Sequence, residues 1–164
     1  MKNFTNKSVL ITGAATGIGR ALAHELANRG AVVYVTALNE KEAQIVVDEI
    51  TSSNGKAIAA ELDVGNFKNI EKMIDLVVSE QGQLDIMINN AGVAYVGESY
   101  DMQVETIEKL AHINFTAVNV GAVLAYTQMK KQGFGHILNT ASMGGFLPTP
   151  AWLFMPRPST AWLG

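Results

Sequence analysis

Three glycines follow directly on a short apolar run, and this juncture constrains the fold more than any other part of the chain. The run 8–12, SVLIT, is apolar and rich in β-branched residues, as expected of a buried strand. It leads into the segment 12–19, TGAATGIG, which contains Gly13, Gly17 and Gly19. Glycine adopts backbone conformations that other residues avoid. The sequence therefore predicts a tight turn from a strand into a helix.

The residues after this turn carry the pattern of an amphipathic helix. Ile18, Leu22 and Leu26 recur at intervals of four within 17–29, and Gly30 stands where helices commonly end. A helix that begins at the glycine turn directs its first amides and the positive end of its dipole at the loop, which favours phosphate binding. A glycine cluster alone could also be an ordinary turn. Its place after the first strand of a β–α series favours the diphosphate of a dinucleotide.

Strand-like apolar runs alternate with amphipathic stretches up to residue 140. Strands are predicted at 8–12, 31–36, 56–60, 84–89 and 134–140, and helices at 17–29, 40–53, 66–81 and 101–131, the last open to a break near its start. Such alternation is typical of an α/β fold of Rossmann type, a parallel sheet with helices on both faces. We expect the strand order 3-2-1-4-5.

The domain predicted from this pattern is an incomplete dinucleotide-binding domain over residues 1–145, cut short after the fifth strand. The composition changes at Phe146, and the segment 146–164 contains all four prolines and both tryptophans of the chain. Prolines at this density oppose a helix. We expect an irregular, apolar tail.

The composition restricts the possible partners and sites. Hydrophobic residues make up 48% and charged residues 16% of the 164, and the net charge is −3, so neither nucleic acid nor an anionic membrane surface is an expected partner. The absence of cysteine excludes disulfides and thiolate metal sites, and His24, His112 and His136 lack metal-ligand spacing. The amino-terminal residues are polar and no apolar run is long enough to span a bilayer. We therefore expect a soluble cytoplasmic protein without a metal.

The chain resembles the short-chain dehydrogenase/reductase family in several motifs that follow one another in the family's order. The first is the glycine spacing of 12–19, Gly-x3-Gly-x-Gly. The others are Asp63-Val64 after the third strand, Asn90-Ala91-Gly92 after the fourth, Asn114 in the long helix and Ser142 after the fifth strand. The resemblance covers residues 5 to about 150.

This resemblance implies an NAD(P)-dependent oxidoreductase that acts on a carbonyl/alcohol pair. It assigns adenine contacts to Asp63-Val64, the nicotinamide side to Asn90-Ala91-Gly92, and surviving catalytic positions to Ser142 and Asn114. The implied cofactor-binding residues are Thr12, Gly13, Thr16, Gly17, Ile18, Gly19, Asp63, Val64, Asn90, Ala91 and Gly92. The substrate would be a small carbonyl or alcohol compound.

Each polar residue of this set also has a structural explanation. Asp63 could be a helix N-cap or a loop carboxylate, and Asn90 could satisfy backbone groups at a strand end. Asn114 could be a surface residue, and Ser142 could belong to a turn before the glycines at 144–145. The sequence leaves these alternatives open.

The choice between NAD and NADP depends on the end of the second strand. An NAD site uses a carboxylate there to accept from the ribose hydroxyls, whereas an NADP site uses a basic residue for the 2′-phosphate. The segment 36–39 has no acid before Glu40, and the obvious basic positions hold Thr16 and Leu38. Arg20 follows the loop, but its direction is open. The missing acid favours NADP slightly over NAD.

The resemblance fails after Ser142. The family places a Tyr 13 positions after this Ser and a Lys four further on, and this chain has Met155 and Ser159 there. A thioether has no titratable proton and a serine hydroxyl carries no charge, so neither replaces the Tyr/Lys pair. We expect impaired redox activity. The alternative is a non-catalytic nucleotide-binding or interaction protein.

A shifted reading frame offers one explanation of this departure. Permitted codons for 150–164, read out of frame, can encode a Tyr and a Lys that fall at positions 155 and 159 when one base is restored. We expect a one-base deletion near Pro150, and a divergent, naturally short relative is the alternative. The nucleotide sequence of the gene distinguishes the two.

An abbreviated sheet would leave apolar surface uncovered. The fifth strand would form an exposed edge, and the long helix would lack the neighbour on which the family packs it. We expect Val118, Val120, Leu124 and Met129 to be partly exposed there. Homo-oligomers or aggregation through this helix and edge are predicted, with marginal stability.

Overall fold

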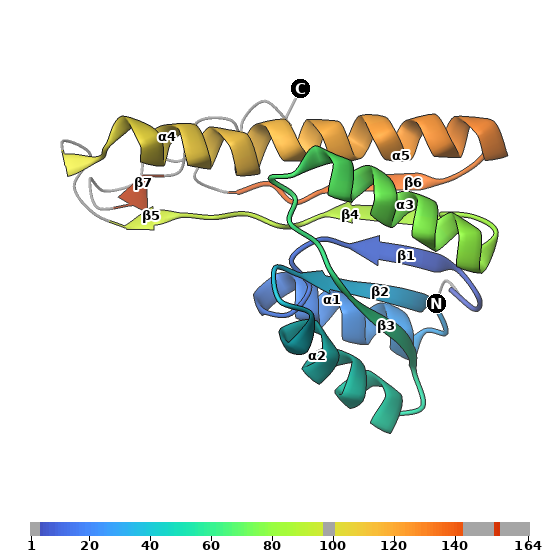
Figure 1. Ribbon diagram of the computed structural model, residues 1–164. Coiled ribbons are helices and arrows are strands. Elements are labelled where there is room, and N and C mark those ends of the chain that lie inside the picture. Colours follow the sequence, from blue (N-terminus) through green and yellow to red (C-terminus); the bar gives the residue numbers. More distant parts are fainter. Residues whose placement is uncertain (1–3, 97–100, 143–152, 155–164) are drawn as a thin grey trace.

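Five parallel strands form the central sheet of the protein, in the order β3-β2-β1-β4-β6 (Figure 1). The computed structural model describes residues 4–96, 101–142 and 153–154. The strands are β1 (Ser8–Ile11), β2 (Val32–Ala37), β3 (Lys56–Glu61), β4 (Ile86–Asn89) and β6 (His136–Asn139). The predicted α/β class and the strand order 3-2-1-4-5 are confirmed, with β6 as the fifth strand of the sheet.

Helices cover both faces of this sheet (Figure 1). They are α1 (Gly17–Asn28), α2 (Glu40–Ser52), α3 (Phe67–Gln81), α4 (Val104–Ala111), the π-helix η2 (His112–Ala117) and α5 (Val118–Gln132). α1 and α2 pack on one face, and α3 and α5 pack on the other. The stretch predicted as one helix over 101–131 is helical from Val104 onward and contains a π segment.

The two hydrophobic cores follow from the two-residue period of the strands. In β1, Val9 and Ile11 belong to the core under α1 and α2, whereas Leu10 between them faces α3 and α5. In β2, Val33 likewise belongs to the core under α1 and α2, and Tyr34 to the core on the other face. A strand whose side chains are buried on both faces is a continuous apolar run, which is why these strands could be located from the sequence.

The predicted strands 84–89 and 134–140 extend beyond the observed β4 and β6. Asp85 lies directly before β4. This charged residue is only 4% exposed, and its carboxylate accepts from the backbone N–H of Ser8 at 3.0 Å. Such hydrogen bonding allows a carboxylate to be buried directly before the strand.

A second, two-stranded antiparallel sheet pairs β5 (Tyr95–Val96) with β7 (Leu153–Phe154), which the sequence did not predict. β7 lies within the segment 146–164, for which an irregular tail was expected. The rest of that segment, including Met155 and Ser159, lies outside the described residues.

The expected exposure of the long helix is wrong for two of its four residues. Val118 and Met129 are buried, at 7% and 5% exposure, because both lie on the inward face of α5, where Met129 joins the core beside α3. Val120 and Leu124 are half-buried. The exposed apolar side chains of this region are Val123 and Tyr126 on α5 and Leu138 on β6.

Candidate cofactor-binding site

The glycine turn between β1 and α1 requires its glycines for two different reasons. Gly13 and Gly17 have φ of +63° and +54°, the left-handed region that favours glycine. A Cβ at Gly13 would also lie 2.9 Å from Cα of Ala91. At Gly19 a Cβ would meet the carbonyl oxygen of Gly13 and would lie 2.6 Å from Nδ2 of Asn90. Close packing against the loop after β4 therefore excludes larger residues.

The first turn of α1 presents bare backbone to the outside. Thr16, Gly17 and Ile18 are exposed, and Thr16 makes no side-chain cap hydrogen bond to the helix. The first amides of a helix have no acceptor within it. A Cβ at Gly17 would meet no heavy atom within 4 Å. Uncapped amides beside open space fit the diphosphate of a dinucleotide.

Asn90 fastens this turn to the loop after β4. Its Nδ2 donates to the carbonyl oxygens of Thr12 and Gly13, each at 3.1 Å, and its Oδ1 accepts from the hydroxyl of Thr140 at 3.3 Å. In return, Oγ1 of Thr12 accepts from the backbone N–H groups of Asn90 and Ala91, each at 2.9 Å. The structure thus brings together the ends of β1, β4 and β6, and with them Thr12, Asn90 and Ala91, three of the residues predicted to bind the cofactor.

Asn114 lies in the π-helix η2 and holds the continuation of the same loop. Its Oδ1 accepts from the backbone N–H of Val93 at 2.8 Å, and its Nδ2 donates to the Val93 carbonyl at 2.7 Å. A Cβ on Gly92 would lie 3.3 Å from Oδ1 of Asn114. Asn114 is half-buried with both amide atoms engaged, so it is not a free surface residue. π segments are frequent at functional sites, but their wider turn leaves no simple spacing signal in a sequence.

Asp63 and Val64 form the loop after β3. Asp63 is exposed, and its Oδ1 accepts from the backbone N–H of Gly65 at 2.8 Å, while Val64 is buried at 8% exposure. The N-cap of α3 is Asn66, so the N-cap alternative for Asp63 is wrong. His112 of η2 contacts this loop, with Nε2 2.8 Å from the Gly65 carbonyl. Sequence reasoning missed His112 because only the fold brings it to Gly65.

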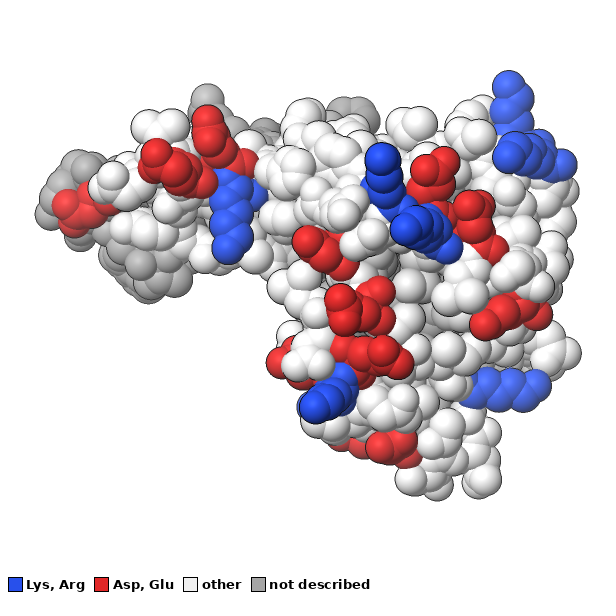
Figure 2. Space-filling view, viewed as in Figure 1, with Lys and Arg blue, Asp and Glu red and all other residues white. Residues whose placement is uncertain are grey.

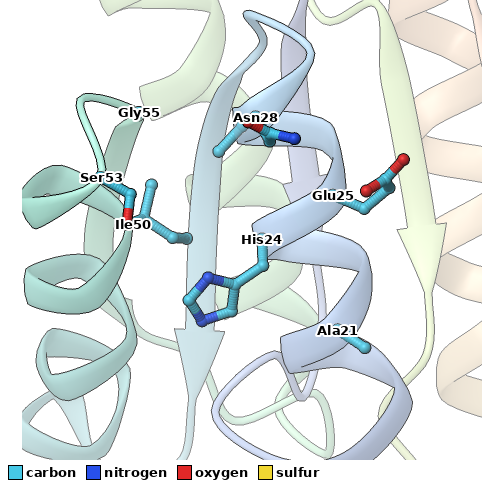
Figure 3. A pocket seen from close by; sticks show the side chains of 8 residues that line it. Ala21, His24, Glu25, Asn28, Ile50, Ser53 and Gly55 are labelled. Atoms are coloured by element: carbon cyan, nitrogen blue, oxygen red, sulfur yellow. The ribbon is translucent and has the colours of Figure 1, made fainter.

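Arg20 is engaged by the neighbouring helix α2. Its guanidinium bonds Glu49 of α2, with Nη2 2.5 Å from Oε1 and Nε 3.1 Å from Oε2, and Nε2 of His24 lies 3.0 Å from the same carboxylate. Hydrogen bonds from Arg20 and then His24 hold the pKa of Glu49 below its usual value. A groove of about 300 Å³ between α1 and α2 is lined by His24, Ile50 and their neighbours (Figure 3). It does not include the Asn90 or Asn114 contacts.

Ser142 follows β6 by three residues and is half-buried. It is the last residue described before 153, and the positions that the family gives to Tyr and Lys fall outside the described residues. Basic and acidic side chains are interspersed over the face seen in Figure 2, without an extended basic area among the described residues.

The described part of the chain lacks two further features. Residues 4–96, 101–142 and 153–154 contain no group of three or more His, Asp or Glu side chains that could hold a metal ion. None of the helices they form is long and apolar enough to cross a bilayer.

A sequence model described as "short chain dehydrogenase" matches residues 7–154. The chain belongs to the short-chain dehydrogenase family. The resemblance seen in the sequence is thereby confirmed. Among its relatives, an uncharacterized oxidoreductase of Thermotoga maritima is 36% identical over 148 residues, which are 90% of this chain and 58% of the relative. A cyclohexanol dehydrogenase of an Acinetobacter species is 34% identical over 145 residues, or 88% of this chain and 58% of the enzyme.

Solved structures of short-chain dehydrogenases have the same architecture. One from Mycobacterium marinum superposes with a TM-score of 0.91 at 36% identity and covers 98% of this chain and 64% of its own. A metagenomic short-chain oxidoreductase, solved in complex with NADP, gives a TM-score of 0.86 at 27% identity, covering 98% of this chain and 71% of its own. The chain spans between 41% and 58% of the length of the curated relatives that it matches.

Proposed function

We propose that the chain binds a nicotinamide dinucleotide at the surface formed by the glycine turn and the loops after β3 and β4. The observation that carries this proposal is the exposed first turn of α1, whose uncapped amides face open space at Gly17. In this proposal the diphosphate lies against the turn, the adenine against the Asp63 loop and the nicotinamide toward Ala91 and Gly92. The proposed binding residues are Thr12, Gly13, Thr16, Gly17, Ile18, Gly19, Asp63, Val64, Asn90, Ala91 and Gly92.

NADP is the proposed cofactor over NAD. No carboxylate stands at the end of β2, where Leu38 is 72% exposed and Oδ1 of Asn39 accepts from the backbone N–H of Lys41 at 3.0 Å. Arg20 is paired with Glu49, so it does not supply the charge for a 2′-phosphate. Lys41 is exposed and is the cation nearest to Leu38 in sequence. A tighter Kd for NADP than for NAD supports this preference, and the reverse order contradicts it.

We propose further that the family reaction, on a small carbonyl or alcohol compound, is impaired in this chain. A bound nicotinamide would supply the hydride chemistry. Ser142 would donate a hydrogen bond to the substrate oxygen, and Asn114 would hold the loop that borders the nicotinamide. Met155 has no titratable proton to exchange with that oxygen, and the hydroxyl of Ser159 carries no charge to replace that of the lysine. This observation also supports the second candidate function, a non-catalytic nucleotide-binding or interaction protein.

Two measurements test these proposals in order. Titration of the chain with NADPH, followed by the fluorescence of the reduced nicotinamide, should give saturable binding. Absence of binding by a folded chain would overturn the cofactor proposal. Incubation with NADPH and a broad panel of aldehydes and ketones should then give no oxidation above the rate without protein. Steady turnover would overturn the proposed impairment and exclude the non-catalytic candidate.

We also propose that copies of the chain associate through α5 and β6. The support is the exposure of Val123 (63%), Tyr126 (61%) and Leu138 (48%) on neighbouring elements. Sedimentation should give a species heavier than 17.6 kDa, and Val123→Glu should return it toward the monomer. A monomer at every concentration would contradict this.

Residues 1–145 are the proposed domain, and the cytoplasm is the proposed location, which fractionation of producing cells would test.

A further inference from the structure

The π-helix η2 contacts two loops of the proposed binding surface through residues only two positions apart. Asn114 holds the loop after β4 by its two hydrogen bonds to Val93. His112 holds the loop after β3 through Gly65. One short segment therefore connects the loop proposed for the adenine with the loop proposed for the nicotinamide.

The donor and the acceptor of the hydrogen bond between His112 and Gly65 can be assigned. A carbonyl oxygen can only accept, so Nε2 of His112, 2.8 Å from the Gly65 oxygen, carries the hydrogen. The backbone N–H of Gly65 donates to Oδ1 of Asp63 at 2.8 Å. Both polar backbone groups of Gly65 are thus occupied, one by the adenine-side carboxylate and one by η2.

Packing also holds the loop at Gly65 against η2. The ring of Phe67 stacks against the ring of His112 at a centroid distance of 4.9 Å and an angle of 33°. A Cβ added to Gly65 would lie 3.2 Å from Cδ1 of Ile113 and 3.1 Å from Oδ1 of Asp63. The loop therefore fits closely between α3 and η2, with little room to move.

We propose that His112 is a positioning residue that fixes the Asp63–Gly65 loop for the adenine half of the dinucleotide. The inference rests on the proposed nucleotide binding. It assigns no proton transfer to His112, which acts through Gly65 and Asp63. Loss of the Nε2 donor should weaken binding of any ligand that carries the adenosine part.

Three substitutions separate the hydrogen bond from the ring. In His112→Gln the side-chain nitrogen stands the same number of bonds from Cβ as Nε2, so the donor is retained. His112→Asn places the nitrogen one bond short, and His112→Ala removes it. Glu108→Gln, at an exposed position of the preceding helix, is the matched control.

The ligands compared are ADP, which has the adenine half alone, and NADPH. In His112→Ala and His112→Asn the Kd of both should rise by the same factor, about three- to tenfold, the effect of one lost hydrogen bond. His112→Gln and Glu108→Gln should bind like wild type. Asn114→Ala, which frees the other loop, should weaken NADPH and leave ADP unchanged.

The outcomes distinguish this inference from the cofactor proposal. If the folded wild-type chain binds neither ADP nor NADPH, both fail. If it binds them and His112→Ala leaves both affinities unchanged, or weakens NADPH alone, the role of His112 is overturned and the cofactor proposal stands. Should His112→Ala fail to fold, equal ADP affinities of His112→Gln and His112→Asn would overturn the role as well.

Discussion

The side chains of Asn90 and Thr12 each satisfy the other residue's backbone. Nδ2 of Asn90 donates to the Thr12 carbonyl at 3.1 Å, and Oγ1 of Thr12 accepts from the Asn90 backbone N–H at 2.9 Å. The two residues are 78 positions apart and lie at the ends of the adjacent strands β1 and β4. This reciprocal pair fixes the glycine turn relative to the loop after β4.

Replacing Asn90 should therefore damage both stability and binding. Asn90→Asp removes both side-chain donors and places a carboxylate against the carbonyls of Thr12 and Gly13, at a cost of about 1–3 kcal/mol. Urea denaturation measures the loss, and NADPH titration should show a Kd at least tenfold higher. Asn90→Ala should be milder because it brings no charge. An Asn90→Asp variant as stable as wild type would contradict the role of these hydrogen bonds.

Gly17 allows a test of the phosphate site with a closely matched control. Gly17→Ala forces alanine into a left-handed conformation, at about 1–2 kcal/mol, and puts a methyl group beside the first amides of α1. Gly82→Ala carries the same backbone penalty, at φ +79°, and its Cβ also meets open space. We expect similar losses of stability, measured by urea denaturation, but loss of NADPH binding in Gly17→Ala alone. Equal affinities of the two variants would contradict the site.

Leu38 tests the cofactor preference. Leu38→Asp places a carboxylate where an NAD site has one, so it should repel a 2′-phosphate and accept from ribose hydroxyls. We expect the ratio of Kd for NADP to Kd for NAD to rise at least tenfold. Ile45→Asp, which adds a carboxylate at another exposed apolar position, is the control and should leave the ratio unchanged. The two titrations must be run at one salt concentration because charge repulsion is screened by salt.

Asp85 should make stability depend on acid pH. Burial raises the pKa of this carboxyl, but hydrogen bonds from Lys7, Ser8 and Gln83 together outweigh burial and hold the pKa below its ordinary value. A lowered pKa in the folded state means that the stabilisation is complete above the unfolded-state value, about 3.9, and declines as the pH falls through the folded-state value. Lys7→Met should cost on the order of 1 kcal/mol at pH 7, because Lys7 is half exposed.

Urea denaturation of Lys7→Met at pH 7 and at pH 3 measures this dependence. The difference from wild type should shrink at the lower pH, because the stabilisation by Asp85 declines as the pH falls toward its lowered folded-state pKa. Lys130→Met, at an exposed position of α5, is the control and should be neutral at both values. A Lys7→Met deficit that is the same at both pH values would argue against the ion pair.

Replacing Gly121 by alanine should lower the stability of the protein, the opposite of the usual effect of this substitution in a helix. Gly to Ala within an exposed helix normally stabilises by about 1 kcal/mol. Here a Cβ would collide with Oδ1 of Asn89, which is 4% exposed and bonded to Asn139 through Nδ2 at 2.8 Å. We expect Gly121→Ala to destabilise by about 1–3 kcal/mol in urea denaturation. A stabilised variant would mean that the buried amide can move aside at little cost.

The sequence alone determined the layers of the fold. The continuous apolar character of runs such as 8–12 and the four-residue spacing of Ile18, Leu22 and Leu26 are local properties, and both correspond to observed elements, β1 and α1. Positive φ at Gly13 and Gly17 likewise follows from the kind of turn that a strand needs to enter a helix. Local sterics and side-chain patterns depend only on residues that are close in the sequence, so they could be predicted.

Only the tertiary structure decided how the loops after β3 and β4 are held. Asn114 contacts Val93 across 21 positions and His112 contacts Gly65 across 47. The engagement of Arg20 by Glu49 and the burial of Met129 depend in the same way on which elements become neighbours. Such contacts require the packed geometry of several elements at once, because residues distant along the chain meet only after the sheet and its helices have assembled.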